Sequence, residues 1–511
     1  MRIHTAISKT ITYLLVITLV FNLCAASWYV LHSDIRFISD VARDFLLFGE
    51  LQEKGIMLLG PRASGIPGLF HGPLWLYLTF PGYVLGGGSP VVVGWYWMGM
   101  IVASLAGGYV VVKRLFDERA ARIFVVLTSA LYISEGAQLI NPHGAFMLLP
   151  IAFYALVRYF QTTNWRWLAG YWLLLGCIIQ FQMAVGIPLF LLSLLPLIIF
   201  VYKKKTYIHL LTGIVIAIPL STFVVFELTH NFAQLRAVLN SSVGESADAP
   251  SMTEVFRERM ALFSNGGMGV FRASATPLNY LLFGLLGWFY LFKVKNREKT
   301  EKNTYFLAAY LYCGYWLLTL LFPGHALFHH WFPITSLSML MVAGVLAQTN
   351  WRVGGVIISI ILLHFAQYSF AHIKMSETII GTAFDSWQFQ QSLTDNIIAQ
   401  SSDEFGYFAY SPDIYAYGPK YALLYMKRQH TEKDIYSFEK KPETFVTIEP
   451  IPADRDDLNS RSWIQEKFGI TSQPVASWSF ENGYSIEKYT LEKTEVEQPI
   501  DPNLDTGVFF R

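Results

Sequence analysis

Long apolar runs separated by short polar connections occupy the first 371 residues of the chain. A helix needs about 20 predominantly apolar residues to cross the ~30 Å hydrocarbon core of a bilayer. Eleven runs approach that length, and they cover residues 11–31, 91–112, 121–139, 144–161, 166–184, 186–202, 207–228, 277–293, 304–322, 327–347 and 353–371. The first run follows Arg2 and Lys9 and is long for a signal peptide, which favours an uncleaved signal anchor. The pattern predicts a polytopic α-helical membrane protein with about 11 transmembrane helices.

Lysine and arginine are concentrated in every second connection between these runs. The basic connections lie at residues 113–122, 158–166, 203–205, 293–302 and 352, whereas those around Asn141, Gly186 and Gly324 contain neither residue type. Cytoplasmic loops of membrane proteins carry an excess of basic residues. We therefore expect a multi-pass protein of the cytoplasmic (inner) membrane, with the N-terminus inside. The odd number of spans then places the C-terminal tail outside.

One further apolar segment, residues 69–85, is short and contains Pro73, Pro81 and Gly82. If this segment crossed the bilayer, every later basic connection would lie outside, against the positive-inside rule. We therefore expect an interfacial or re-entrant helix at this position. The chain would then have a transmembrane domain at residues 1–374, with one long external loop at 32–90.

The tail from residue 375 to residue 511 has a different pattern, which predicts a small extracytoplasmic α/β domain. Strand character is found at residues 404–410, 444–448 and 476–491. The last of these is divided by Glu481-Asn482-Gly483, which is typical of a hairpin turn. Helical runs are expected at residues 419–427 and 460–468, and Gly469 would end the second.

The overall composition agrees with a membrane location. Hydrophobic residues make up 53% of the 511 residues, the mean hydropathy is +0.38, and charged residues make up only 15%. A soluble domain usually has about 25% charged residues. The formal net charge of +1 argues against nucleic acid as a partner. All three cysteines lie within apolar runs, so we expect no disulfide framework.

The external loop begins with a segment, residues 32–55, that has the pattern of a juxtamembrane helix. Ser33 is a candidate N-cap and Gly55 a candidate C-terminal stop. Helical spacing gives an apolar stripe of Phe37, Val41, Phe45 and Phe48 and a charged face of Arg36, Asp40, Arg43 and Asp44. A solvated face of ordinary ion pairs, each worth at most about 1 kcal/mol, or a basic amphipathic anchor would share this pattern.

Two further motifs follow in the same loop, Gly60-Pro61-Arg62-Ala63-Ser64 and Phe70-His71-Gly72-Pro73-Leu74. With Asp40-Val41-Ala42-Arg43-Asp44 just outside the first span, they resemble the GT-C superfamily of integral-membrane glycosyltransferases. The nearest members are the bacterial relatives of dolichyl-phosphate-mannose–protein mannosyltransferase and the lipid A aminoarabinose transferase. Short segments that agree with the resemblance are Asn141-Pro142, Gln180–Gln182 and Phe226–Phe232. The family often shows Asp-Glu where this chain has Asp40-Val41.

The resemblance implies a membrane-bound glycosyltransferase of the hexosyl- or pentosyltransferase class. Its donor would be a polyprenyl-phosphate-linked sugar, and its acceptor a lipid, a glycan or a protein on the external face of the membrane. Such a donor already has a good leaving group, so the main requirement is a base for the acceptor hydroxyl. The resemblance places Asp40 at the catalytic-aspartate position, and Asp44 is the second candidate catalytic residue.

The leaving phosphate needs positive charge or hydrogen-bond donors. The candidates for binding it are Arg36, Arg43, Arg62 and His71, because arginine in particular recognises phosphate bidentately. Direct displacement would invert the anomeric centre, as the resemblance favours. A retaining route needs a second carboxylate about 5–5.5 Å from the first, and Asp40 and Asp44, one helical turn apart, leave that route open.

Three ionisable residues outside this loop are candidates for lining a cavity, namely Glu227, His325 and His329. A glutamate at the end of a span is costly in lipid, and either a functional or a structural role explains it. The histidines have no carboxylate at metal-ligand spacing, so we expect hydrogen bonding or phosphate contact. No metal site is predicted. Some GT-C enzymes use a divalent cation bound by carboxylates, so a divalent cation stays an open alternative as a cofactor.

The main alternative is a membrane transporter or flippase of lipid-linked or sugar substrates. Transporters tend to carry ionisable residues or broken helices at the middle of the membrane, often in two related halves. This chain instead gathers its charges in one external loop and shows no internal repeat. A catalytically inactive scaffold or receptor is the second alternative, and it would tolerate Asp40→Asn.

Overall fold

The computed structural model describes residues 2–63, 66–240, 250–322, 324–413, 415–455, 457–502 and 504. The chain forms two compact units, each described by itself below. The membrane unit comprises Met1–Ser27, Ile56–Leu78 and Trp97–Ile373, and the C-terminal unit comprises Trp28–Gly55, Thr79–Tyr96 and Lys374–Arg511. Two parts of the predicted external loop therefore belong to the same unit as the tail.

Every predicted span coincides with helical structure. The elements are α1 (Arg2–Ala26), α5 (Pro90–Leu115), α6 (Glu118–Glu135), α7 (Asn141–Thr162), α8 (Trp165–Phe181), α9 (Met183–Lys204), η1 (Tyr207–Ile216) with α10 (Ala217–Thr229), α13 (Leu278–Phe292), α14 (Lys299–Thr319), α15 (Phe328–Trp331) with η5 (Phe332–Ile334) and α16 (Thr335–Gln348), and α17 (Trp351–Ile379). Within the described residues, seven helices are long and apolar enough to cross a membrane. The predicted class of polytopic helical membrane protein is confirmed, whereas the count of about 11 spans is not.

Shorter helices occupy the connections. They are α2 (Trp28–Leu31), α3 (Ser39–Lys54), α4 (Leu74–Leu85), α11 (Ala233–Asn240), α12 (Met252–Ser264), η2 (Gly266–Met268), η3 (Ala273–Ala275) and η4 (Val294–Asn296). The segment expected to be interfacial or re-entrant forms α4, which has 12 residues and contains Pro81. At 1.5 Å per residue, α4 is about 18 Å long, which is too short to cross a bilayer core.

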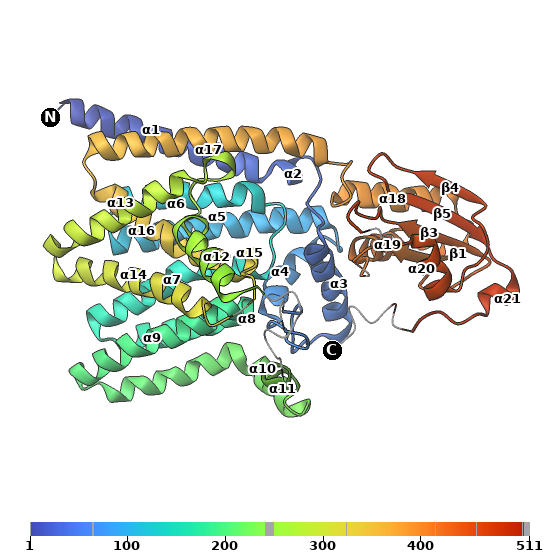
Figure 1. Ribbon diagram of the computed structural model, residues 1–511, viewed down its shortest axis with the longest axis horizontal. Coiled ribbons are helices and arrows are strands. Elements are labelled where there is room, and N and C mark those ends of the chain that lie inside the picture. The colour runs from blue at the N-terminus through green and yellow to red at the C-terminus, as the bar shows by residue number, and fades with distance from the viewer. Residues whose placement is uncertain are drawn as a thin grey trace. The chain divides into compact units, whose positions relative to one another are not determined.

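The first and last helices of the membrane unit lie side by side (Figure 1). Asn22 on α1 is completely buried, and its amide donates a hydrogen bond to Ser129 Oγ on α6 at 3.0 Å. Ser369 on α17 donates to Asn22 Oδ1 at 3.1 Å, across 347 positions of sequence. A polar side chain in an apolar interior stays stable only when it is hydrogen-bonded, so Asn22 ties three helices together.

A five-stranded sheet forms the centre of the C-terminal unit, with strand order β2-β1-β3-β5-β4. The strands are β1 (Glu404–Tyr410), β2 (Asp434–Ser437), β3 (Glu443–Ile448), β4 (Ala476–Ser479) and β5 (Ser485–Thr490). β1 pairs in parallel with β2 and β3, and β5 pairs antiparallel with β3 and β4. Its helices are α18 (Trp387–Gln400), α19 (Tyr417–Gln429), α20 (Ser460–Trp463) with η6 (Ile464–Phe468), and α21 (Lys493–Val496).

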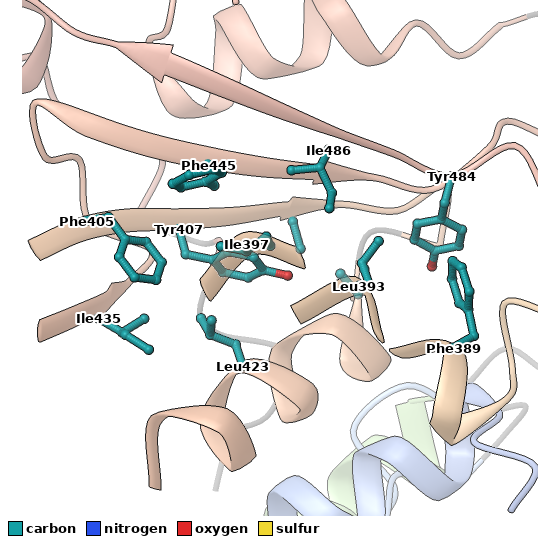
Figure 2. Packing of buried hydrophobic residues seen from close by; sticks show 12 residues of the cluster. Phe389, Leu393, Ile397, Phe405, Tyr407, Leu423, Ile435, Phe445, Tyr484 and Ile486 are labelled. Carbon is teal, nitrogen blue, oxygen red and sulfur yellow. The ribbon is translucent and has the colours of Figure 1, made fainter. Parts of the chain in front are cut away.

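Hydrophobic side chains cover both faces of this sheet, because successive residues of a strand point to opposite sides. On one face Phe405 and Tyr407 of β1 pack with Leu393 of α18 and Leu423 of α19, as Figure 2 shows. On the other face Phe408 belongs to a second cluster, which includes residues of η6. The sheet is therefore buried between helices, which confirms the predicted small C-terminal α/β domain.

The local predictions for the tail agree closely with these elements. β1 and β3 lie where strands were expected, and Gly483, in the turn between β4 and β5, has a left-handed φ of 87°. The helix ending at Gly469 is also present, and that glycine has φ 64°. β2 and α18 were not predicted, because neither has a strong local pattern of its own.

Candidate functional site

Helix α3 carries the candidate catalytic carboxylates, but it begins at Ser39 and not near His32. Ser33 has φ 58° and does not cap it, so that part of the prediction is wrong. Residues 35–37 are extended instead, because they pair with the tail of the chain. Phe37 N donates to Asp385 O at 2.5 Å, and Trp387 N donates to Ile35 O at 3.2 Å. The tail of the chain thus pairs with the segment before the helix. The predicted stop at Gly55 is confirmed by its φ of 73°.

Arg43 lies between the two candidate carboxylates and contacts both. Its Nη1 is 2.5 Å from Asp40 Oδ1, and its Nη2 is 2.9 Å from Asp44 Oδ1. Burial by itself lowers the pKa of Arg43, but the two carboxylates raise it above its ordinary value. The structure thus brings Asp40, Arg43 and Asp44 together on α3, as predicted from their spacing.

The two carboxylates differ in accessibility. The side chain of Asp40 is 47% exposed, whereas that of Asp44 is only 4% exposed. A group that takes a proton from a substrate must be within hydrogen-bond reach of it. Asp40 meets that requirement better than Asp44, which is suited to orienting Arg43.

Arg36 does not lie on the charged face of α3, because the helix starts after it. Its guanidinium forms an ion pair with Asp385, whose side chain is 6% exposed, and Nε donates to the same carboxylate at 2.9 Å. The structure therefore gives Arg36 a contact that holds the segment before α3 against the tail. Its predicted contact with donor phosphate stays a prediction.

The apolar stripe of α3 is buried, as predicted. Phe45 is 5.0 Å from Tyr421 of α19 between ring centroids, and Phe37 is 5.7 Å from the same ring. Ser39 Oγ donates to Asp413 Oδ2 at 3.2 Å. The C-terminal domain thus contacts α3 at its first turn and near its middle.

The middle of the external loop, Ile56–Leu78, belongs to the membrane unit and folds back on itself. Arg62 and Phe70 form an antiparallel bridge, and Gly60 N donates to His71 O at 2.8 Å. A Cβ atom at Gly60 would lie 2.1 Å from Gly72 O, and one at Gly72 would lie 1.6 Å from Gln180 Oε1. Glycine at position 60 is therefore required for close packing within the loop, and glycine at position 72 for close packing against Gln180 near the end of α8.

A cavity of about 290 Å³ lies in the membrane unit beside this loop. Apolar side chains form most of its lining, and its polar lining residues are His71, Gln182, Arg259, Tyr315, Thr319 and His330. We call it the Arg259 cavity. Small-molecule sites commonly combine a largely apolar lining with a few convergent polar groups.

Arg259 of α12 is the most unusual residue of this cavity, because only 2% of it is exposed. Its Nη1 lies 2.7 Å from Glu258 Oε2, and its Nη2 donates to Gly324 O at 2.5 Å. Its buried Nε has no hydrogen-bond partner among the described residues. The free Nε donor of this buried guanidinium fits a ligand that presents acceptor oxygens, such as a phosphate group.

The other residues predicted from the sequence differ in burial and in the groups they contact. His71 is buried and lines the Arg259 cavity, whereas Arg62 is exposed. Glu227 accepts hydrogen bonds from Gln234 N and Leu235 N at the start of α11, which is a structural role. His325 contacts Glu258 at 3.3 Å, and the backbone carbonyl of His329 accepts a hydrogen bond from Gln182.

Sequence reasoning missed Arg259 as a residue of a cavity. Arg259 occurs in Arg257-Glu258-Arg259, which has the pattern of an ordinary solvated helix face. Its guanidinium instead contacts the backbone carbonyls of Phe322 and Gly324, more than 60 positions later. Among the described residues, no group of three or more histidine, cysteine, aspartate or glutamate side chains is placed to hold a metal ion.

The fold of this chain is similar to that of solved structures over nearly its whole length. The crystal structure of ArnT from Cupriavidus metallidurans in the apo state matches with a TM-score of 0.61 at 10% sequence identity, over 94% of this chain and 98% of that one. ArnT bound to undecaprenyl phosphate matches with a TM-score of 0.60 at 10% identity, over 96% and 99%. The Archaeoglobus fulgidus oligosaccharyltransferase in complex with Zn and sulfate is less similar, at 10% identity and a TM-score of 0.46 over 83% and 62%. No family model and no curated protein matches the sequence.

Proposed function

We propose that the protein transfers a glycosyl group from a polyprenyl-phosphate donor to an acceptor hydroxyl at the external face of the cytoplasmic membrane. The observation that carries this proposal is the Arg259 cavity, where one buried guanidinium with a free donor is surrounded by apolar side chains. A phosphate attached to a hydrocarbon chain has the same combination of anion and apolar surface. The similarity in fold to a protein whose structure was solved with undecaprenyl phosphate supports this donor class.

In this reaction Asp40 is the general base. Its carboxylate accepts the proton of the acceptor hydroxyl as the acceptor oxygen bonds to the anomeric carbon. The bond from that carbon to the phosphate oxygen breaks, and polyprenyl phosphate leaves with the electron pair. Within the membrane unit, Arg259 and His71 are the proposed hydrogen-bond partners of the donor phosphate, in a site of low dielectric constant. No acid is required, because the phosphate leaves as an anion.

The surroundings of Asp44 support inversion over retention. A retaining route requires a second carboxylate to attack the sugar from within about 5.5 Å of the first. The Asp44 side chain is almost completely buried, and its Oδ1 receives hydrogen bonds from both Nε and Nη2 of Arg43. We therefore assign Asp44 to holding Arg43, with Asp40 as the only reacting carboxylate.

The proposal is tested with full-length protein in lipid nanodiscs and radiolabelled polyprenyl-phosphate sugars. We expect Asp40→Asn to lower the transfer rate about 100-fold or more while donor binding is kept, because general bases typically contribute 10²–10⁴-fold. Glu53→Gln, an exposed carboxylate near the end of the same helix, is the matched control and should transfer at the wild-type rate. Equal transfer by wild type and Asp40→Asn would remove the base from this mechanism.

Arg259 is tested separately through donor binding. Arg259→Gln should weaken binding of the polyprenyl-phosphate donor about tenfold or more, because a hydrogen bond to a charged group contributes about 1.5–3 kcal/mol. Arg259→Lys keeps the charge and should lose less. Wild-type protein that binds the donor and moves it across the bilayer without glycosyl transfer would instead support the flippase alternative.

A further inference from the structure

A second cavity of about 340 Å³ lies in the membrane unit and has no part in the function proposed above. It shares no lining residue with the Arg259 cavity. The short helix α15 contributes to both, because Trp331 lines the second cavity and the neighbouring His330 lines the Arg259 cavity. We call it the Trp331 cavity. Its lining combines aromatic rings with amide, hydroxyl and guanidinium groups.

Arg272 supplies the only charged side chain among the residues that line the Trp331 cavity. Its Nη1 donates to Ser134 Oγ at 2.8 Å and lies 3.9 Å from Glu135 Oε1. Glu135 is also 3.6 Å from His143 Nε2. Among the described residues, no hydrogen bond engages the Nε or Nη2 of Arg272, and its side chain is 21% exposed. Arg272 can therefore donate to a ligand while it remains paired.

Glu135 already compensates the charge of Arg272, so this cluster does not require an anionic ligand. A neutral group with acceptor oxygens can use the free donors of Arg272 without disturbing its ion pair.

Aromatic rings supply the apolar part of the Trp331 cavity. Trp331, Phe332 and Tyr368 all line it. Phe332 is held rigidly, with its ring stacked on Phe146 at 4.8 Å between centroids. Flat aromatic faces offer a large apolar surface to a ligand with few side-chain rotamers to restrict.

A sugar ring has the complementary chemistry, since it presents C–H groups on its faces and hydroxyl groups around its rim. Besides Arg272, the cavity lining holds Asn265 and Thr276. Asn265 Oδ1 accepts a hydrogen bond from Asn279 Nδ2 at 2.9 Å. The amide N–H groups of Asn265 therefore point away from Asn279. The volume lies at the lower end of the ~300–1,000 Å³ range of small-molecule sites, which suits a mono- or disaccharide better than a lipid tail.

We propose that the Trp331 cavity binds a neutral saccharide. This proposal does not rest on the function proposed above.

The experiment measures equilibrium binding of tritiated methyl glycosides to full-length protein in nanodiscs. The probes are the neutral glycosides of glucose, galactose, mannose and N-acetylglucosamine, their β-linked disaccharides, and methyl glucuronide as the anionic comparison. We expect at least one neutral probe to bind, and Trp331→Ala to weaken it about tenfold, the value of a lost aromatic contact. Trp331→Phe should lose less. Trp165→Ala, an exposed tryptophan at the start of α8, is the matched control and should bind like wild type.

Arg272→Gln provides an independent variant, and it should also weaken neutral-saccharide binding about tenfold. Binding of the polyprenyl-phosphate donor by both variants checks that the membrane unit is folded, because the Arg259 cavity contains neither residue. Absence of binding by every neutral probe, a preference for glucuronide, or equal affinity in wild type and Trp331→Ala would overturn the proposal. Saccharide binding that depends on Trp331 in a protein without transferase activity would refute the proposed function but keep the site.

Discussion

Asp34 is a completely buried carboxylate just before α3, and it shows how single residues connect the two ends of the C-terminal unit. Its Oδ2 accepts from Ser386 Oγ at 2.7 Å, and its Oδ1 accepts from Gln388 N at 3.1 Å. Burial raises the pKa of Asp34 above its ordinary value, although the hydrogen bond from Ser386 opposes this effect. A carboxylate with a raised pKa in the folded state binds its proton more tightly there than in the unfolded chain.

The pH dependence of stability follows from this shift. At pH values between the pKa of about 3.9 in the unfolded chain and the higher pKa in the folded state, the folded protein binds more protons than the unfolded chain. The contribution of Asp34 to the free energy of unfolding therefore falls as pH rises through that interval. Asp34→Asn should flatten this change, so the difference in thermal unfolding midpoint between wild type and variant should vary between pH 4 and pH 7. A difference that is constant over this range, as expected for the exposed control Glu481→Gln, would contradict the assignment.

At the scale of elements, α3 is the structure on which the proposed chemistry depends. Its apolar face packs against α19, its first turn contacts Asp413, and its last turn ends at Gly55. Gly49 lies within the helix, where a Cβ atom would meet its nearest neighbour at 3.7 Å, an ordinary contact distance. Gly55 has no atom within 4 Å of a Cβ position, but its φ of 73° disfavours any residue other than glycine.

These two glycines in one helix predict opposite effects of alanine. Gly55→Ala should lower the free energy of unfolding by about 1 kcal/mol, because it forces a side chain into a left-handed conformation. Gly49→Ala should raise it by up to about 1 kcal/mol, because glycine is a poor helix former and the added methyl group has room. Thermal unfolding of the full-length protein in one detergent gives both values. Shifts in the same direction would show that these local backbone terms do not govern the stability of α3.

At the scale of the whole molecule, we propose the orientation that the basic connections predict, with the N-terminus inside and both the loop and the tail outside. In a variant without the native cysteines, single cysteines at Glu53 and Glu481 should react with a membrane-impermeant maleimide added to intact cells. A cysteine at Lys204 should react only after the membrane is permeabilised. All three positions are exposed side chains, so a lack of reaction reports topology and not burial. Labelling of Lys204 in intact cells would refute this orientation.

The positions of the membrane helices and of most strands could be derived from the sequence alone. A membrane helix satisfies its backbone hydrogen bonds within its own segment, so the length of an apolar run is sufficient to place it. Strand character at residues 404–410 and 444–448 likewise located β1 and β3, and a glycine at the end of a helical pattern located the end of α3. The cluster of Asp40, Arg43 and Asp44 was predictable for the same reason, since residues three and four apart share a helix face.

The tertiary structure alone decided the features that depend on residues far apart in sequence. Arg36 contacts Asp385 across 349 positions, and this pairing with the tail is why α3 starts later than its local pattern suggests. Arg259 is buried and contacts the distant carbonyls of Phe322 and Gly324, and the Trp331 cavity exists only where four separate segments meet. Local sequence patterns record which side of an element avoids water, whereas cavities and buried ion pairs arise from the packing of one element against another.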